Sequence, residues 1–190
     1  MVGPELSGGK VNLRPVCDAD LPRRTEWLND PETVRLFTGS APTRVYERVD
    51  AKRWRQSLEA DLAAVVWAVE TKEGRHIGDL DLHSIDRYQR SAKLTILLGD
   101  KAFWNQGCGA DAIRTLLDHA FSELGMDSVS LRVYDFNERA IRCYEKCGFT
   151  RTWATWDDSG SPAGPGEIHM LVTRDHFFMV RDPDVGTLCA

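Results

Sequence analysis

The chain has no apolar run that approaches the roughly 20 residues needed to cross a bilayer. Its first residues, Met1 to Leu6, also lack the basic and apolar regions of a signal peptide. We therefore expect a cytoplasmic protein with no membrane partner.

Basic residues are not in excess, because 24 Lys and Arg stand against 29 Asp and Glu, a formal net charge of −5. Binding along a nucleic acid needs a basic face, so we expect no nucleic-acid partner. The negative charge is mildly compatible with cationic substrates.

Cysteines are few and odd in number, and none forms a C-x-x-C pair, so disulfides are not indicated. Cys143 and Cys147 share a helix face. Without His or Cys partners at metal spacing they are typical of packing residues, and we expect no metal site. The five cysteines are Cys17, Cys108, Cys143, Cys147 and Cys189.

The composition is that of an ordinary globular protein, with 42% hydrophobic and 28% charged residues. A length of 190 residues fits one domain, so we expect residues 1–190 to form a single domain. The N-terminal third predicts a strand at 11–16 and helices between about 18 and 60. Asp30-Pro31-Glu32 is typical of a helix start, because Asp accepts from free amides and Pro loses no bond there.

The middle of the chain changes from strand to helix signals. Apolar segments at 64–69, 77–82 and 94–98 predict an antiparallel meander. Apolar residues at helical spacing from Ile113 to Leu124 then predict an amphipathic helix. A strand at 129–133, a helix that Asn137 can cap and two final strands follow. The loop at 157–166, rich in Gly and Pro, joins these strands and is a candidate flap.

Two glycines, Gly107 and Gly109, stand at the start of the amphipathic helix. Amides at a helix N-terminus lack intrahelical acceptors, and glycine lets phosphate oxygens approach them, so the segment predicts an anion cradle. A glycine-assisted turn is the simpler alternative. A dinucleotide fingerprint with Asp135 as the ribose acid is disfavoured, because residues 99–106 separate the strand from the first glycine.

The segment Val133–Phe149 contains Tyr144 on the same helix face as Ala140 and Ile141. Its plain interpretation is a core aromatic with a polar tip. A phenol beside a leaving thiolate could instead serve as a general acid.

Together these segments resemble the GNAT acetyltransferase superfamily over nearly the whole chain, in particular the branch with the ribosomal-protein N-terminal and spermidine acetyltransferases. The opening, Asn12-Leu-Arg-Pro15 with Trp27-Leu-Asn-Asp-Pro-Glu32, looks like that branch. Asp100–Gly109 is similar to its acetyl-CoA motif, and Asn137–Phe149 resembles its last motif almost position by position.

The resemblance implies a mixed α/β (α+β) fold, with a mostly antiparallel twisted sheet of about seven strands flanked by helices. It implies acceptor-side helices at about 18–60, an acetyl-CoA core at about 64–149 and C-terminal strands at about 149–176.

The resemblance also implies direct transfer from acetyl-CoA, with no cysteine nucleophile, so that Cys108 is a variable position of the motif. Pantetheine would lie along the strand that ends at Gly99, the pyrophosphate would meet the amides of 104–110, and Tyr144 would face the sulfur as general acid. The residues implied for acetyl-CoA are Leu97, Leu98, Gly99, Trp104, Asn105, Gln106, Gly107, Cys108, Gly109, Ala110, Asn137, Ala140 and Tyr144.

The sequence departs from the family pattern at two positions. Lys93 stands where members of this branch often carry a carboxylate, and Trp104 stands where many superfamily members have Arg or Gln. The general base is therefore left open between Asp79, Asp81, His83 and water. A solvated sheet face is the simpler interpretation of the three side chains, and His169 is interpreted as structural.

Three functions remain compatible with the sequence. We expect first an N-acetyltransferase acting on the primary amine of a small cationic molecule, with Glu26, Asp30, Glu32, Asp157 and Asp158 as acidic residues near the acceptor. The alternatives are a protein N-terminal or lysine acetyltransferase and a non-catalytic acyl-CoA-binding protein. Residues 139–146 are also similar to aminoglycoside 6′-acetyltransferases. The oligomeric state is open, with a homodimer among the alternatives.

Overall fold

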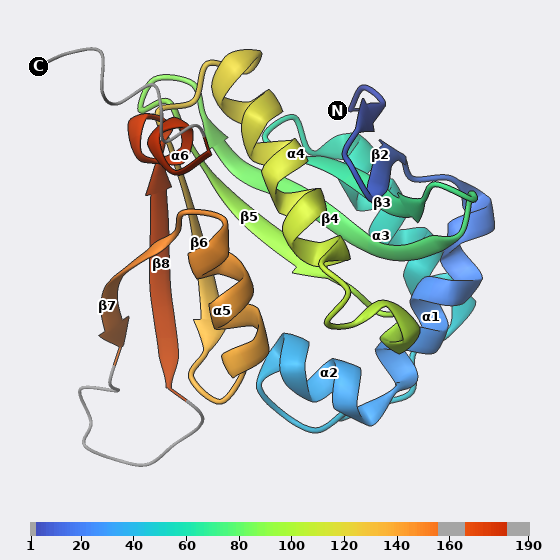
Figure 1. Ribbon diagram of the computed structural model, residues 1–190. Coiled ribbons are helices and arrows are strands. Elements are labelled where there is room, and N and C mark those ends of the chain that lie inside the picture. Colours follow the sequence, from blue (N-terminus) through green and yellow to red (C-terminus); the bar gives the residue numbers. More distant parts are fainter. Residues whose placement is uncertain (1–2, 156–165, 182–190) are drawn as a thin grey trace, which may run out of the picture.

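The computed structural model describes residues 3–155 and 166–181. These residues form an eight-stranded sheet of order β1-β2-β3-β4-β5-β6-β8-β7, flanked by six α-helices (Figure 1). Every neighbouring pair of strands is antiparallel except β5 and β6, which run parallel. The strands are β1 (Leu6–Ser7), β2 (Val11–Pro15), β3 (Val65–Thr71), β4 (His76–Asp86), β5 (Ser91–Leu97), β6 (Ser128–Tyr134), β7 (Thr150–Thr155) and β8 (Glu167–Thr173).

The helices cover both faces of the sheet. They are α1 (Leu21–Asn29), α2 (Pro31–Thr38), α3 (Arg48–Ala60), α4 (Cys108–Ser122), α5 (Glu138–Lys146) and α6 (Arg174–Arg181), with short 3₁₀ turns η1 (Asp18–Asp20) and η2 (Lys101–Phe103). Figure 1 shows α4 and α5 on the near face. None of the described helices is long and apolar enough to cross a membrane.

The main core lies between α4 and the sheet. Leu116 and Leu117 of α4 are fully buried against Trp67 of β3 and Leu80 of β4, so the amphipathic helix predicted from the sequence is confirmed. On the opposite face Arg24 of α1 forms an ion pair with Asp79 of β4.

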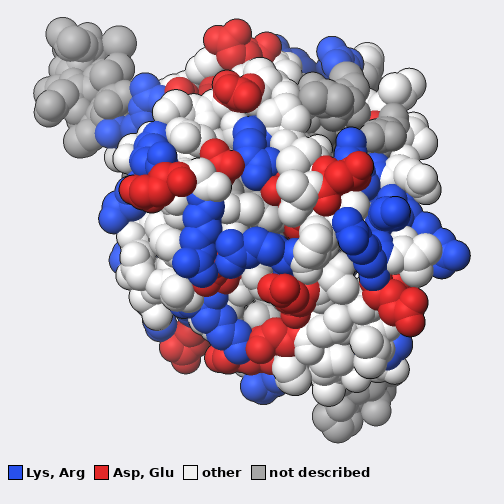
Figure 2. Space-filling model, turned by 90° about the vertical axis from the view of Figure 1, so that its right-hand side faces the viewer, with Lys and Arg blue, Asp and Glu red and all other residues white. Residues whose placement is uncertain are grey.

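Figure 2 shows acidic and basic side chains interspersed on the face at the right of Figure 1. Arg24 of α1 also stacks on Trp54 of α3, 3.5 Å from its ring centroid. This contact holds α1 and α3 together on the sheet face opposite α4.

Several predicted helix starts are confirmed. The Asp30 side chain accepts from the Thr33 amide at 2.8 Å, and Asn137 accepts from the Ala140 amide at 3.2 Å. The α3 helix begins at Arg48, and the side chain of Asp50 in its first turn accepts a hydrogen bond from the Glu47 amide at 2.8 Å.

Two elements near the ends of the described chain complete the expected mixed α/β fold. The two-residue β1 pairs with β2 and brings the sheet to eight strands, compared with about seven expected. After β8 ends at Thr173, the chain turns into α6, whose Phe177 is buried in the core. The candidate flap at 157–166 lies, apart from Gly166, outside the described residues.

Candidate active site

A gap opens in the middle of the sheet between β5 and β6. The two strands pair only where Ser91–Lys93 meets Ser128–Ser130. Beyond this point they diverge, so residues 94–97 and 131–134 have no ladder partner across the gap (Figure 1). Backbone groups of both strands are therefore left to meet a ligand.

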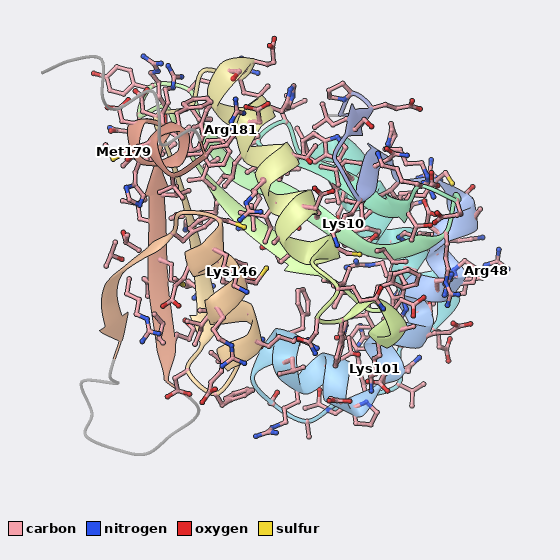
Figure 3. All side chains as sticks on the ribbon, viewed as in Figure 1. Lys10, Arg48, Lys101, Lys146, Met179 and Arg181 are labelled. Atoms are coloured by element: carbon pink, nitrogen blue, oxygen red, sulfur yellow. The ribbon has the colours of Figure 1, made fainter. Side chains whose placement is uncertain are left out.

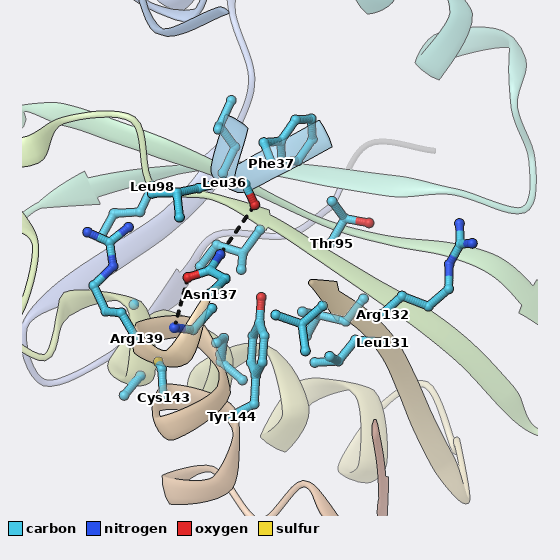
Figure 4. Close-up of a pocket in the computed structure, with 18 of the residues that line it drawn as sticks. Leu36, Phe37, Thr95, Leu98, Leu131, Arg132, Asn137, Arg139, Cys143 and Tyr144 are labelled. Atoms are coloured by element: carbon cyan, nitrogen blue, oxygen red, sulfur yellow. Dashed lines mark hydrogen bonds between the residues drawn. The ribbon is translucent and has the colours of Figure 1, made fainter. Parts of the chain in front are cut away.

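A cavity of about 640 Å³ lies at this gap and is lined by residues of both strands (Figure 4). It is lined from both faces of the sheet, because neighbouring residues such as Leu131 and Arg132 point to opposite sides. The lining comes from α2, β4, β5, the loop before α4, α4 itself, β6, α5 and β8. A cavity of this size fits a cofactor-sized ligand.

The start of α4 borders the cavity and has the properties of an anion site. Asn105 and Gly107 have positive φ values of 60° and 83°, which turn the chain so that α4 begins at Cys108. The amides of Gly109 and Ala110 lie in the first turn, where no carbonyl precedes them in the helix. The helix dipole adds positive potential at the same point.

Basic side chains lie around this helix start. Lys10 reaches the Gln106 carbonyl with its Nζ at 2.8 Å, and Lys146 of α5 lines the cavity (Figure 3). Free amides, a helix N-terminus and nearby cations together suit a diphosphate better than a neutral ligand.

Ten of the residues predicted to bind acetyl-CoA line the cavity: Leu97, Leu98, Trp104, Asn105, Gly107, Gly109, Ala110, Asn137, Ala140 and Tyr144. The other three predicted residues, Gly99, Gln106 and Cys108, are not part of the lining. The Gly99 amide donates to the Ile77 carbonyl at 3.1 Å, the Gln106 side chain donates to the Ala102 carbonyl, and Cys108 is buried.

Tyr144 points its hydroxyl into the cavity from α5 (Figure 4). Its ring packs edge-on against Phe149 at 5.9 Å, which fixes its direction. Burial raises the pKa of Tyr144, and the neighbouring Cys143 and Cys147 add to the shift. The phenol is therefore protonated at neutral pH, as a proton donor must be.

The side chain of Asn137 connects α2 to the start of α5 at the edge of the cavity. Its Oδ1 caps α5, and its Nδ2 donates to the Leu36 carbonyl at 3.2 Å (Figure 4). A second tie comes from Tyr134 of β6, whose hydroxyl donates to the Thr38 carbonyl at 2.8 Å. Two adjacent hydrogen bonds thus fasten the end of α2 to the α5 side of the gap.

Arg139 is a cavity residue that the sequence patterns did not single out. Its guanidinium lies over the Trp104 indole, 3.5 Å from the ring centroid, and burial lowers its pKa. Trp104 in turn donates its Nε1 hydrogen to the Leu98 carbonyl at 2.7 Å. Within the described part of the chain Arg139 forms no ion pair, so its charge is available to an anion.

The three carboxylate and imidazole candidates for the base are separated by the fold. Asp79 is buried, not solvated, because α1 covers it; it pairs with Arg24 and lies 3.1 Å from His76 Nε2. His83 lines the cavity, and its Nδ1 lies 2.8 Å from Asp81 Oδ1. Of these three side chains only His83 belongs to the cavity lining, and Asp81 lies behind it as its hydrogen-bond partner.

No cluster of three or more His, Cys, Asp or Glu side chains among the described residues could hold a metal ion. The cavity is lined by cationic side chains, by the Tyr144 phenol and by the His83 imidazole.

Comparisons with known proteins agree with this geometry. The chain is 27% identical over 187 residues to an aminoglycoside N(6′)-acetyltransferase type 1 of Klebsiella pneumoniae, covering 92% of this chain and 89% of the relative. It is 19% identical to the FsC-acetyl coenzyme A-N(2)-transacetylase of Aspergillus fumigatus, with 96% and 81% covered.

A solved structure of the spermidine N-acetyltransferase from Vibrio cholerae in complex with CoA and spermine has the same fold. It superposes with a TM-score of 0.76 at 20% identity, covering 88% of this chain and 98% of that one. The model of the acetyltransferase (GNAT) domain matches residues 10–150, which include the whole sheet from β2 to β6 and the cavity residues of α4 and α5. The chain therefore belongs to the GNAT superfamily of acetyl-CoA-dependent N-acetyltransferases.

Proposed function

We propose that this chain transfers the acetyl group of acetyl-CoA directly to a primary amine of a small molecule. The observation that carries the proposal is that the amides at the start of α4 and the hydroxyl of Tyr144 meet in the same cavity. A single domain over residues 1–190 and a cytoplasmic location belong to the same proposal.

The donor side of the cavity binds the coenzyme. The amides of Gly107, Gly109 and Ala110 hold the diphosphate, with Arg139 as a cation beside it. The pantetheine arm lies along the free edge of β5 at Leu97 and Leu98. The Leu98 carbonyl already accepts from Trp104, so the arm takes its hydrogen bonds from other backbone groups of that edge.

The reaction needs a proton donor and a proton acceptor on this chain. Bound acetyl-CoA supplies a thioester carbonyl that the amine attacks. Tyr144 gives its proton to the departing thiolate, and its raised pKa keeps that proton in place beforehand. His83, oriented by Asp81, or a water molecule takes the proton of the attacking amine.

The acceptor is proposed to be a small cationic amine, on the basis of the net charge of −5 and of the acceptors in the names of the relatives. The acidic residues proposed for it are partly engaged. Lys101 lies 2.7 Å from both Asp30 and Glu32. Asp157 and Asp158 lie outside the described residues, and Glu167, in the described lining, pairs with Arg132 at 3.1 Å.

The first test measures binding and turnover separately. Calorimetry measures acetyl-CoA binding, and a screen across polyamines, aminoglycosides, amino sugars and short peptides measures release of the CoA thiol, with products identified by mass spectrometry. We expect binding and acetylation of a small amine. Acetylation of a peptide N-terminus or lysine alone would move the assignment to a protein acetyltransferase. Binding without turnover on any acceptor would indicate an acyl-CoA-binding protein.

Tyr144→Phe tests the mechanism. The variant keeps the ring and removes the proton, so kcat should fall roughly 10²- to 10⁴-fold while the KM for acetyl-CoA changes little. Tyr88→Phe is the matched control, because Tyr88 is 92% exposed and outside the cavity. Wild-type turnover of Tyr144→Phe would assign the phenol to packing.

A further inference from the structure

Two thiols, Cys143 on α5 and Cys147 at its C-terminal end, have no part in the proposed reaction. Cys143 is half-buried and lines the cavity (Figure 4), whereas Cys147, one turn later, is buried with its Sγ 3.6 Å from the Ala110 carbonyl oxygen. Cys143 faces the start of α4, since a Cβ atom at Gly109 would lie 3.7 Å from its Sγ. The Cys143 sulfur packs against the core and also lies beside the amides proposed to hold the diphosphate.

The surroundings of Cys143 favour its thiolate, which is the reactive form of a cysteine. The neighbouring Cys147 lowers the pKa of Cys143, and the charges of Arg114, Lys146 and Arg139 act in the same direction, against the effect of burial. The interaction with Cys143, together with burial, raises the pKa of Cys147, which remains a thiol. Burial raises the pKa of Cys108. Cys143 lines the cavity together with Arg139 and Lys146, whereas Cys108 and Cys147 are buried and outside the lining, so Cys143 is the described thiol that a reagent in the cavity can reach.

A disulfide between Cys143 and Cys147 is disfavoured by geometry. Side chains one helical turn apart have Cβ atoms about 5–6 Å apart, whereas a disulfide holds its Cβ atoms about 3.5–4.5 Å apart. Closing the bond would distort α5 next to Tyr144. An oxidant that reaches the cavity should therefore react with Cys143 alone.

We propose that Cys143 is a redox-sensitive thiol that forms a mixed disulfide with a small-molecule disulfide and so blocks the coenzyme site. Its thiolate attacks one sulfur of the reagent; the new S–S bond forms, the original S–S bond breaks, and the other half leaves as a thiolate. Reagents with carboxylates are favoured, because Arg139 and Lys146 line the same wall. The blocking effect rests on the coenzyme placement proposed above.

Oxidised glutathione is a suitable probe, used on the full chain with site-resolved mass spectrometry. We expect glutathione on Cys143 and on the exposed Cys17, and little on the buried Cys108 and Cys147. Acetyl-CoA at about ten times its Kd should slow modification of Cys143 about tenfold, because the free protein falls by that factor. Cys17, which lies outside the cavity lining, is the internal control and should react at an unchanged rate.

Calorimetry then tests the consequence. Treated wild-type protein should lose acetyl-CoA binding and regain it with dithiothreitol, while treated Cys143→Ser should keep the affinity it had before treatment. An unreactive Cys143, or glutathionylated protein with unchanged affinity, would overturn the proposal. Untreated protein that binds no acetyl-CoA while Cys143 still reacts would overturn the proposed function and leave the reactive thiol supported.

Discussion

The guanidinium carbon of Arg139 lies 3.5 Å from the ring centroid of the Trp104 indole, a contact that joins α5 to the loop before α4. The family resemblance implies Arg or Gln where this chain has Trp104, and a tryptophan side chain offers no charge to a phosphate. Arg139 brings a positive charge to Trp104 from α5. We propose that the indole holds the guanidinium in place and that the guanidinium supplies the charge for the diphosphate.

Arg139→Gln should weaken acetyl-CoA binding roughly 10- to 100-fold, the value of a charge-assisted hydrogen bond to phosphate. Arg139→Lys should lie between wild type and Arg139→Gln, because lysine keeps the charge and loses the planar stack. Calorimetry at low and raised salt measures both, and the wild type should lose more affinity with salt than Arg139→Gln.

The control for Arg139 is Arg48→Gln, which removes one charge at the start of α3, far from the cavity (Figure 3). Equal losses in Arg139→Gln and Arg48→Gln would mean that only the overall charge of the protein matters.

Gly109→Ala should separate folding from binding. The added Cβ would meet only Cys143 Sγ at 3.7 Å and Leu98 Cδ2 at 3.9 Å, which are ordinary contacts. Alanine is the better helix residue, so the variant should unfold at an equal or higher temperature, with a gain of up to about 1 kcal/mol. Acetyl-CoA affinity should nevertheless fall, because the methyl group occupies space that phosphate oxygens need.

Thermal unfolding measures the stability of the Gly109→Ala variant, and calorimetry on the same sample measures its affinity for acetyl-CoA. A lower melting temperature would mean that the glycine serves the fold. Unchanged affinity in a stable variant would place the diphosphate elsewhere.

The parts of the site that could be predicted are those encoded locally. Asn137 caps α5 from within three residues, and the two glycines at the start of α4 are contiguous with the helix they open. Helical spacing predicts the face of α5 on which Tyr144 lies, whereas its proposed role as general acid comes from the family resemblance. Short-range signals of this kind need no knowledge of the rest of the fold.

The parts that could not be predicted depend on distant contacts. Arg139 meets Trp104 only because α5 packs beside α4, and the Asn137–Leu36 hydrogen bond joins residues 101 positions apart. Asp79, Asp81 and His83 share one face of β4, yet α1 buries Asp79 whereas His83 lines the cavity. A strand pattern gives the face of each side chain, but what covers that face is set by tertiary packing.

Acid should weaken the ion pair between Arg14 of β2 and Asp20, which connects β2 to the turn before α1. The guanidinium of Arg14 donates two hydrogen bonds to the Asp20 carboxylate, at 2.8 and 2.7 Å. Burial by itself would raise the pKa of Asp20, but Arg14 and the Cys17 amide outweigh it and hold the pKa at about 2. Because the folded pKa lies below the unfolded value near 3.9, the pair stabilises the protein above about pH 4. This stability, about 2 kcal/mol, is lost as the pH falls toward 2.

The Asp20→Asn variant isolates this effect from other titrating groups. Urea unfolding of wild type and variant between pH 6 and pH 2.5 should give a difference in unfolding free energy that is largest near pH 6 and shrinks toward the acid end. A difference that stays constant with pH would mean that Asp20 acts through packing and hydrogen bonding rather than through its charge.

The last prediction concerns the proton acceptor. His83 of β4 lies opposite Lys93 of β5 in the strand register. Lys93 stands at the position where the family resemblance implies a carboxylate, so His83 is its cross-strand neighbour. With Nδ1–H donated to Asp81 at 2.8 Å, the lone pair on Nε2 of the neutral ring is left free to accept a proton, directly or through water.

His83→Ala should therefore lower kcat roughly 10²- to 10⁴-fold with little change in acetyl-CoA affinity, and Asp81→Asn should lower it less, because Asp81 only orients the ring. Added imidazole should restore part of the activity of His83→Ala by entering the space left by the side chain, whereas it should not restore Tyr144→Phe, which lacks an acid rather than a base. Damage to the fold would show no such selectivity. Full activity of His83→Ala without imidazole would assign the proton to water and leave the other roles in the cavity as proposed.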